Sequence, residues 1–280
     1  MNNKYEAPAL RFEFGENWQR FLSVLDDEKI KEAENSIKDS LKISSLKGLS
    51  FLDAGSGSGL YSLAACRLGA DKVFSFDYDP KSVACTRELK KRYYPDSENW
   101  IVEQGSVLDE DYLKGLPTFN VVYSWGVLHH TGAMWQAMDK LADKVDEGGY
   151  LYISIYNDQG RASRIWTGVK RLYNNLPDVM HWPMQIACLI WLWVPWSFYD
   201  LLRGQPFKGW REYGKSRGMS PWHDVVDWVG GYPFEVAKPE EVFEFLSQRG
   251  FILKKLLTMA GGHGCNQFVF LKQCNERSCP

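Results

Sequence analysis

The residues best suited to chemistry form a glycine-rich stretch that directly follows a short apolar segment. Asp53 ends the apolar run 49–52 and opens a loop in which glycines stand at alternate positions, Gly55, Gly57 and Gly59. Apolar residues at helical spacing follow the loop, so the pattern predicts a strand, a tight turn and a helix in that order. This arrangement is typical of a nucleotide-binding corner, because glycine allows close approach of a ligand and the helix N-terminus presents free N–H groups.

The acid before the first glycine distinguishes this corner from one that binds a dinucleotide. Dinucleotide sites have the spacing G-x-G-x-x-G, whereas the glycines here have the spacing G-x-G-x-G. Asp53 would repel a pyrophosphate and suits an ammonium or sulfonium cation. Asp77 ends the next predicted strand, 73–77, where it can accept hydrogen bonds from ribose hydroxyls. A ribose and a cation without phosphates describe S-adenosylmethionine.

Several ordered motifs make the sequence resemble the class I S-adenosylmethionine-dependent methyltransferases. They are the stretch 53–59, Asp77, the stretch 105–107 and the stretch 121–130. The resemblance covers about residues 45–156, with a weaker echo near 238–272, and it is greatest to small-molecule methyltransferases of the ubiquinone-biosynthesis type. It implies a methyltransferase whose cofactor is S-adenosylmethionine.

The resemblance also implies which residues contact the cofactor. Similar enzymes often have an acid where Ser106 stands, and N-terminal segments often close over the cofactor, as Phe14 and Trp18 would here. Trp125 is expected to lie against the sulfonium, since aromatic faces attract cations; the alternative is that it fills the core. The expected cofactor contacts are Asp53, Gly55, Ser56, Gly57, Gly59, Asp77, Tyr78, Ser106, Val107, Trp125, Gly126, Phe14 and Trp18.

A general base is expected if the methyl acceptor is a hydroxyl group, and none is needed for an activated carbon or an amine. Histidine is the natural candidate, and His223 has the neighbouring acid Asp224, which could orient it in a loop. The predicted catalytic residues are His223, His129, His130 and Asp224, and the predicted substrate contacts are Tyr156, Trp222, His263 and Asn266. No metal site is expected, because no further ligand stands at i+3 or i+4 from the paired histidines.

Strand and helix patterns alternate from residue 49 onward, which predicts an α/β fold. We expect a doubly wound, mostly parallel seven-stranded sheet of the Rossmann-like methyltransferase type, with a large, mainly helical insertion. The predicted divisions are an N-terminal arm and helix that could cover the cofactor (1–48), the cofactor-binding core (49–156), an insertion that caps the substrate (157–237), a helix and β-hairpin that complete the core (238–273), and a tail (274–280).

The predicted insertion concentrates the aromatic residues of the chain. Eight of the 12 tryptophans lie in it, and the stretch 186–198 is almost continuously apolar. That stretch is shorter than the ~20 residues that span a bilayer. Basic stretches precede and follow it, which suits a membrane interface. Two interpretations stay open: a cap packed on the core, and a cap that also makes peripheral membrane contact through 182–203.

Composition sets the remaining expectations. The net charge of −2 gives no sign of a nucleic-acid partner, so the sequence predicts a small-molecule or lipid-linked acceptor. Six cysteines without a C-x-x-C pair favour free thiols and a cytoplasmic location, with the inner face of a membrane as a further option. O-methylation is favoured. The alternatives are cyclisation or aminocarboxypropyl transfer from the same cofactor, and a non-catalytic membrane-associated binding module; the oligomeric state stays open.

Overall fold

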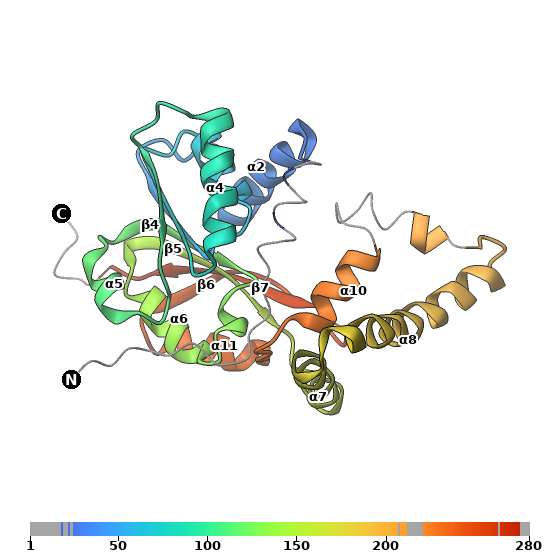
Figure 1. The fold of residues 1–280 in the computed structure, drawn as a ribbon. Coiled ribbons are helices and arrows are strands. Elements are labelled where there is room, and N and C mark those ends of the chain that lie inside the picture. Colours follow the sequence, from blue (N-terminus) through green and yellow to red (C-terminus); the bar gives the residue numbers. More distant parts are fainter. Residues whose placement is uncertain are drawn as a thin grey trace. The chain divides into compact units, whose positions relative to one another are not determined.

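A computed structural model describes Trp18, Leu22 and residues 25–206, 208–211, 221–262 and 264–274. The described chain forms two compact units, which we treat separately (Figure 1). The first contains the residues up to Gly160 and those from Glu235 onward, and the second is Arg161–Phe234. The domain limits predicted at 157 and 237 differ from these limits by a few residues.

A seven-stranded sheet forms the centre of the first unit (Figure 1). Its strand order is β3-β2-β1-β4-β5-β7-β6. The first five strands are parallel, and β7 is antiparallel to both β5 and β6. The predicted fold class is therefore confirmed. The strands are β1 (Ser50–Ala54), β2 (Lys72–Asp77), β3 (Trp100–Gln104), β4 (Phe119–Trp125), β5 (Val145–Tyr156), β6 (Phe251–Leu257) and β7 (Cys265–Lys272).

Successive apolar side chains along the strands point to opposite faces of this sheet, and helices cover both faces. Phe51 and Val121 face one core cluster and Leu52 and Val122 face the other. The first cluster is closed by α2 (Asp27–Leu41), α3 (Leu60–Arg67) and α4 (Pro80–Tyr93), and the second by α5 (Glu110–Gly115), α6 (Met134–Ala142) and α11 (Pro239–Ser247).

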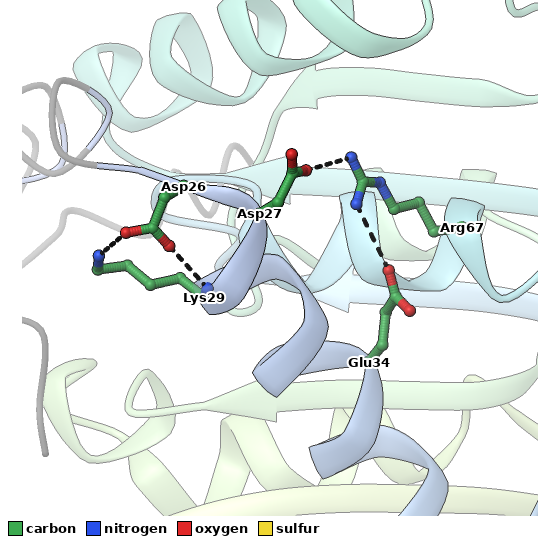
Figure 2. Close-up of polar contacts among 5 residues, drawn as sticks. All are labelled: Asp26, Asp27, Lys29, Glu34 and Arg67. Atoms are coloured by element: carbon green, nitrogen blue, oxygen red, sulfur yellow. Dashed lines mark hydrogen bonds and ion pairs between the residues drawn. The ribbon is translucent and has the colours of Figure 1, made fainter.

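Acidic residues cap the start of α2 and pair with an arginine of α3. Asp26 caps α2 by accepting a hydrogen bond from the backbone N–H of Lys29 at 2.9 Å (Figure 2). The Arg67 guanidinium at the end of α3 pairs with Asp27 at 3.0 Å and with Glu34 at 3.8 Å (Figure 2). These contacts hold α2 against α3.

Three elements differ from the sequence prediction. Helix α5 was not predicted. The sequence pattern predicts a strand over 150–156, but β5 begins at Val145, because Val145 pairs with Phe119 and the glycines at 148–149 are part of the strand. Residues Pro221–Gly230 form the helix α10, whereas their prolines and glycines had suggested a loop.

The second unit is mainly helical, as predicted. It contains α7 (Arg161–Asn175), the short helix η2 (Asp178–Met180), α8 (His181–Leu202) and α10. The Lys170 side chain is fully buried in it, with its ammonium 4.2 Å from the ring centre of Trp228 and 4.6 Å from that of Phe234. The same ammonium donates a hydrogen bond to the Trp228 carbonyl oxygen, so the buried charge is held by aromatic faces and a backbone oxygen.

Candidate active site

The loop between β1 and α3 leaves no room for a side chain at Gly55, Gly57 or Gly59. Gly57 has a φ of 54°, and a Cβ added there would lie 2.9 Å from the indole ring of Trp18. A Cβ on Gly55 would lie 2.4 Å from the Val127 side chain. The loop therefore presents bare backbone, as the approach of a nucleoside requires. Trp18 lies against this loop, while Phe14 is outside the described residues.

Asp53 lies at the end of a chain of buried hydrogen bonds. The indole N–H of Trp100 donates to Ser75 Oγ at 2.8 Å, and the Ser75 hydroxyl donates to Ser62 Oγ at 2.7 Å. The Ser62 hydroxyl in turn donates to Asp53 Oδ2. Each hydroxyl has one proton, so the indole donor fixes the direction of the chain. The chain orients the Asp53 carboxyl from β3, β2 and α3.

The electrostatic environment of Asp53 favours its neutral form when no ligand is bound. Burial raises the pKa of Asp53 to about 7, the hydrogen bond from Ser62 opposes this rise, and the negative charge of Asp77 adds to it. A cation beside Asp53 would reverse the effect, since opposite charge stabilises the carboxylate. The position therefore suits a positively charged ligand, which fits the predicted cofactor.

Asp77 ties the glycine loop to the end of β2. Its Oδ2 accepts a hydrogen bond from the Gly57 N–H at 2.9 Å, and its Oδ1 accepts one from the Asp79 N–H at 2.9 Å. A carboxylate can accept about four hydrogen bonds, which suits the predicted contact of Asp77 with ribose hydroxyls. Tyr78 follows it and is 42% exposed.

Helix α4 packs against the glycine loop through Thr86. A Cβ on Gly59 would lie 2.9 Å from Thr86, and the Thr86 and Ser56 hydroxyl oxygens are 3.0 Å apart. The Thr86 hydroxyl also donates to the Gly57 carbonyl oxygen at 3.3 Å. Ser56 is therefore engaged with the helix through its side chain, and its backbone remains part of the loop.

The predicted cofactor contacts Ser106 and Val107 follow β3. The Ser106 hydroxyl oxygen accepts a hydrogen bond from the Leu108 N–H at 3.2 Å, which forms a local turn. Val107 is buried in the core cluster closed by α5, α6 and α11. Ser106 is partly exposed at the end of the strand, on the same edge of the sheet as Asp77.

Trp125 and Gly126 stand at the end of β4, which is the neighbour of β1. Trp125 is 43% exposed, so it does not fill the core. Gly126 has a φ of 75°, and its N–H donates to Ser154 Oγ at 2.8 Å. Exposure at this end of β4 leaves the face of Trp125 open to a cationic ligand.

His129, His130 and Tyr156 form a ring cluster next to this edge of the sheet. The ring centres of His129 and Tyr156 are 4.0 Å apart, and those of the two histidines are 4.5 Å apart. Both histidines are buried, in the short helix η1 (Leu128–His130), and Tyr156 ends β5. Two of the predicted catalytic residues and one predicted substrate contact thus come together.

Glu235 is distant from this cluster in the sequence and holds it in position. Its backbone N–H donates to the His129 carbonyl oxygen at 2.9 Å, and its carboxylate oxygens accept from the Met134 N–H at 3.2 and 3.1 Å. Burial raises the pKa of Glu235, and the N–H groups of Met134 and Gly132 oppose the rise. The carboxylate caps α6 and so fixes the turn that contains His129.

Asn266 makes its side-chain hydrogen bonds within the protein. Its amide oxygen accepts from the Met259 N–H at 2.9 Å, and its amide nitrogen donates to Asn157 Oδ1 at 3.1 Å. It is fully buried, so it joins the β6–β7 hairpin to the end of β5. His263, the neighbouring predicted contact, lies outside the described residues.

The predicted His223–Asp224 pair lies on α10, with Trp222, in the second unit. These residues lie on a helix rather than in the expected loop, and the orientation of His223 by Asp224 stays a prediction. The His223 side chain is outside the described part of the structure. The candidate site above is therefore built from the first unit alone. Within the described residues, no group of three or more His, Cys, Asp or Glu side chains could hold a metal ion.

Sequence reasoning missed Ser62, Ser75, Thr86 and Glu235. The signal for two of them was available, because Ser62 and Ser75 are hydroxyls in otherwise apolar segments, and buried polar groups need partners. Thr86 and Glu235 carry no comparable signal in the sequence.

A family model described as "Methyltransferase domain" matches residues 16–208, more than half of the chain. The chain belongs to this methyltransferase family. It is an S-adenosylmethionine-dependent methyltransferase, and the predicted cofactor is confirmed. The narrower similarity to ubiquinone-biosynthesis enzymes stays a prediction.

Solved structures share the fold. The magnesium protoporphyrin IX methyltransferase from Synechocystis PCC 6803, solved with bound SAH, has a TM-score of 0.53 at 14% identity, covering 92% of this chain and 95% of that one. A putative S-adenosylmethionine-dependent methyltransferase from Listeria monocytogenes has a TM-score of 0.50 at 14% identity, covering 92% and 98%.

Curated relatives correct one prediction. The chain is 29% identical over 147 residues to the tRNA U34 carboxymethyltransferase of Pseudomonas aeruginosa, and 29% identical over 150 residues to that of Hahella chejuensis. The matches cover 52% and 54% of this chain and 44% and 45% of the relatives, so the chain spans about half their length. Because these relatives modify tRNA, the prediction that excluded a nucleic-acid partner is contradicted. A whole-chain net charge does not reveal local basic clusters, which is why it misled.

Proposed function

We propose that this methyltransferase transfers the methyl group to an oxygen atom of a small or lipid-linked acceptor, at the ends of β1, β2 and β4. The observation that carries the methyl donor is the buried carboxyl of Asp53 beside Asp77 at a bare glycine loop, and the oxygen acceptor rests on the ring cluster of His129, His130 and Tyr156. Two acids at this point favour a cation and disfavour phosphates. S-adenosylmethionine supplies an electrophilic methyl group on a sulfonium.

The first unit offers a role for each end of the cofactor. Asp77 accepts hydrogen bonds from the ribose, and Ser106 with Val107 borders the base. Asp53 faces the cationic amino acid part, and Trp125 lies over the sulfonium, where an aromatic face contributes about 0.5–2 kcal/mol. The loop holds the methyl group in one place, and alignment of this kind accounts for much of a transfer rate.

The histidine cluster supplies the chemistry that an oxygen acceptor needs. A hydroxyl must lose its proton as it attacks, and an imidazole accepts protons near neutral pH. His129 and His130 are the candidates that belong to the first unit, and Tyr156 borders them. Glu235 keeps their turn in place.

Carboxymethyl transfer to tRNA is the second candidate, and the similarity to the tRNA U34 carboxymethyltransferases favours it. A carboxymethyl group on the donor would bring a further carboxylate next to Asp53 and Asp77. Plain methyl transfer adds no such charge and therefore agrees better with two neighbouring acids.

Mass spectrometry of the reaction products separates the candidates. The full chain is incubated with S-adenosylmethionine labelled in its methyl group, or with the analogue that carries a labelled carboxymethyl group on the sulfonium. Each donor is tested in parallel with a bulk tRNA pool and with an extract of small and lipid molecules. We expect S-adenosylhomocysteine and a labelled methyl ether or ester in the extract, and loss of both in His130→Ala. A labelled methyl group on carbon or nitrogen would refute O-methylation. Modified tRNA with an unmodified extract would refute the proposed acceptor.

A further inference from the structure

The C-terminal half of α8, Ile190–Leu202, exposes apolar side chains on almost every side. Val194 is 55% exposed and Trp196 is 66% exposed, although they point about 200° apart around the helix. Between 45% and 71% of each of the following side chains is exposed: Ile190, Trp191, Val194, Trp196, Phe198, Tyr199, Leu201 and Leu202.

Among the described residues, the second unit covers only part of this half. Trp166 of α7 stacks on Trp191, with ring centres 5.4 Å apart, and Trp210 packs against Trp193, with ring centres 4.9 Å apart. The Gly209 N–H donates to Asp200 Oδ2 at 2.7 Å. The first half of α8 packs along α7: Gln185 Nε2 donates to the Tyr173 hydroxyl at 2.7 Å, and Cys188 is buried. The helix is thus anchored at its start and extends past its support.

Neither common explanation of an apolar helix fits. A core helix of a soluble protein is mostly buried, but only 6% of the most apolar window in Asp178–Leu202 is buried. A signal sequence lies near the N-terminus, and this segment lies in the second half of the chain. The helix has 22 residues, about 33 Å, so it is longer than the apolar stretch that the sequence had suggested.

Cations gather at the exposed end. Residues 201–211 contain Arg203, Lys208 and Arg211 and no acid. All three side chains are exposed. Because the segment 208–211 folds back onto Trp193 and Asp200, Lys208 and Arg211 lie alongside the apolar surface rather than beyond it.

We propose that Ile190–Leu202 inserts among the acyl chains at the surface of an anionic lipid bilayer, with Arg203, Lys208 and Arg211 against the headgroup phosphates. A second helix would cover one strip of the exposed surface, whereas acyl chains surround a helix on all open sides. Tryptophan and tyrosine favour the membrane–water interface, and an anionic surface attracts basic side chains.

Vesicle co-sedimentation of the full chain tests this. We expect binding to vesicles of phosphatidylcholine and phosphatidylglycerol in equal parts, weaker binding to phosphatidylcholine alone, and release by salt. The double variant Val194→Asp/Phe198→Asp should bind at least tenfold more weakly with an unchanged melting temperature. Val179→Asp is the matched control, because Val179 is 80% exposed but lies outside this half of α8.

Three results would overturn the proposal. One is the absence of binding to both vesicle types. Another is a large fall in the melting temperature of Val194→Asp/Phe198→Asp but not of Val179→Asp, which would mean that the chain itself covers the helix. The third is lipid-free self-association by sedimentation velocity that the double variant abolishes, which would assign the surface to a second copy.

Discussion

The Asp53 carboxyl should make cofactor binding depend on pH. With its pKa raised by burial to about 7, it is neutral below that pH in the ligand-free protein. A sulfonium ligand favours the ionised form, so S-adenosylmethionine should bind more tightly as the pH rises through about 7. Calorimetric titrations over this range measure the effect.

Two variants control this prediction. Asp53→Asn should flatten the pH dependence, because the amide does not titrate. Ser62→Ala removes a hydrogen bond that lowers the pKa of Asp53, so its midpoint should move to higher pH. An unaltered pH profile in Asp53→Asn would assign the dependence to another group.

The same carboxyl should affect stability in the opposite direction. Folding raises the pKa of Asp53 from 3.8 to about 7, so between these values the folded chain holds a proton that the unfolded chain has lost. The stabilising contribution is complete below the lower value and is lost as the pH rises through the upper one. The melting temperature of the ligand-free wild type should therefore fall more between about pH 5 and about pH 8 than that of Asp53→Asn. Parallel curves for the two proteins would show that Asp53 does not titrate as described.

The placement of single residues was predictable where a motif fixed it. The glycines, Asp53 and Asp77 follow from spacing after apolar strands. The support for Asp53 was not predictable, because the pairing of β1 with β2 brings Ser75 beside it and α3 brings Ser62. Those neighbours depend on tertiary register, which the sequence does not reveal directly.

At the scale of elements, the β1–α3 loop depends on close approach. Gly57→Val should abolish cofactor binding and leave the sheet intact, since its side chain would meet the Trp18 ring and the φ of 54° strains a branched residue. Gly48→Val is the control: Gly48 has a φ of 81° but nothing within 4 Å of an added Cβ. Binding and circular dichroism are measured together. A folded Gly57→Val protein that still binds would disprove the close approach.

The β6–β7 hairpin depends on Asn266. Asn266→Ala should lower the free energy of unfolding by about 1–3 kcal/mol, because Met259 and Asn157 lose a buried partner. Urea denaturation gives the value. Gln267→Ala is the comparison on the other face of β7, where the Gln267 side chain accepts a hydrogen bond from the Tyr152 hydroxyl at 2.7 Å in a partly buried position. Equal small losses in both variants would contradict a special role for Asn266.

Elements with a clear period were predicted well, and elements with mixed signals were not. The parallel strands and their helices followed from alternation. Residues 221–230 looked like a loop because they begin with Pro221 and end with Gly230. Proline is, however, favoured at the start of a helix and glycine at its end. Helix α8 looked short because His181, Pro183 and Gln185 interrupt its apolar run.

At the scale of the whole molecule, one unit carries the cofactor chemistry and the other carries eight of the 12 tryptophans. The family and the fold could be predicted from the first unit, whose motifs have fixed chemistry. The partners could not, because a sum over all charges says little about a surface. The cytoplasmic location stays a prediction.

Calorimetric titration of the full chain with S-adenosylhomocysteine tests the central claim, that the acids at the β1 and β2 ends hold the cofactor. We predict micromolar binding at one site, weakened by about 1–3 kcal/mol in Asp77→Ala through lost charged hydrogen bonds. The control variant Asp96→Ala, at an exposed position, should bind S-adenosylhomocysteine like the wild type. NAD should give no heat of binding. Equal affinity of Asp77→Ala and wild type, or binding of NAD as tight as that of S-adenosylhomocysteine, would contradict the account.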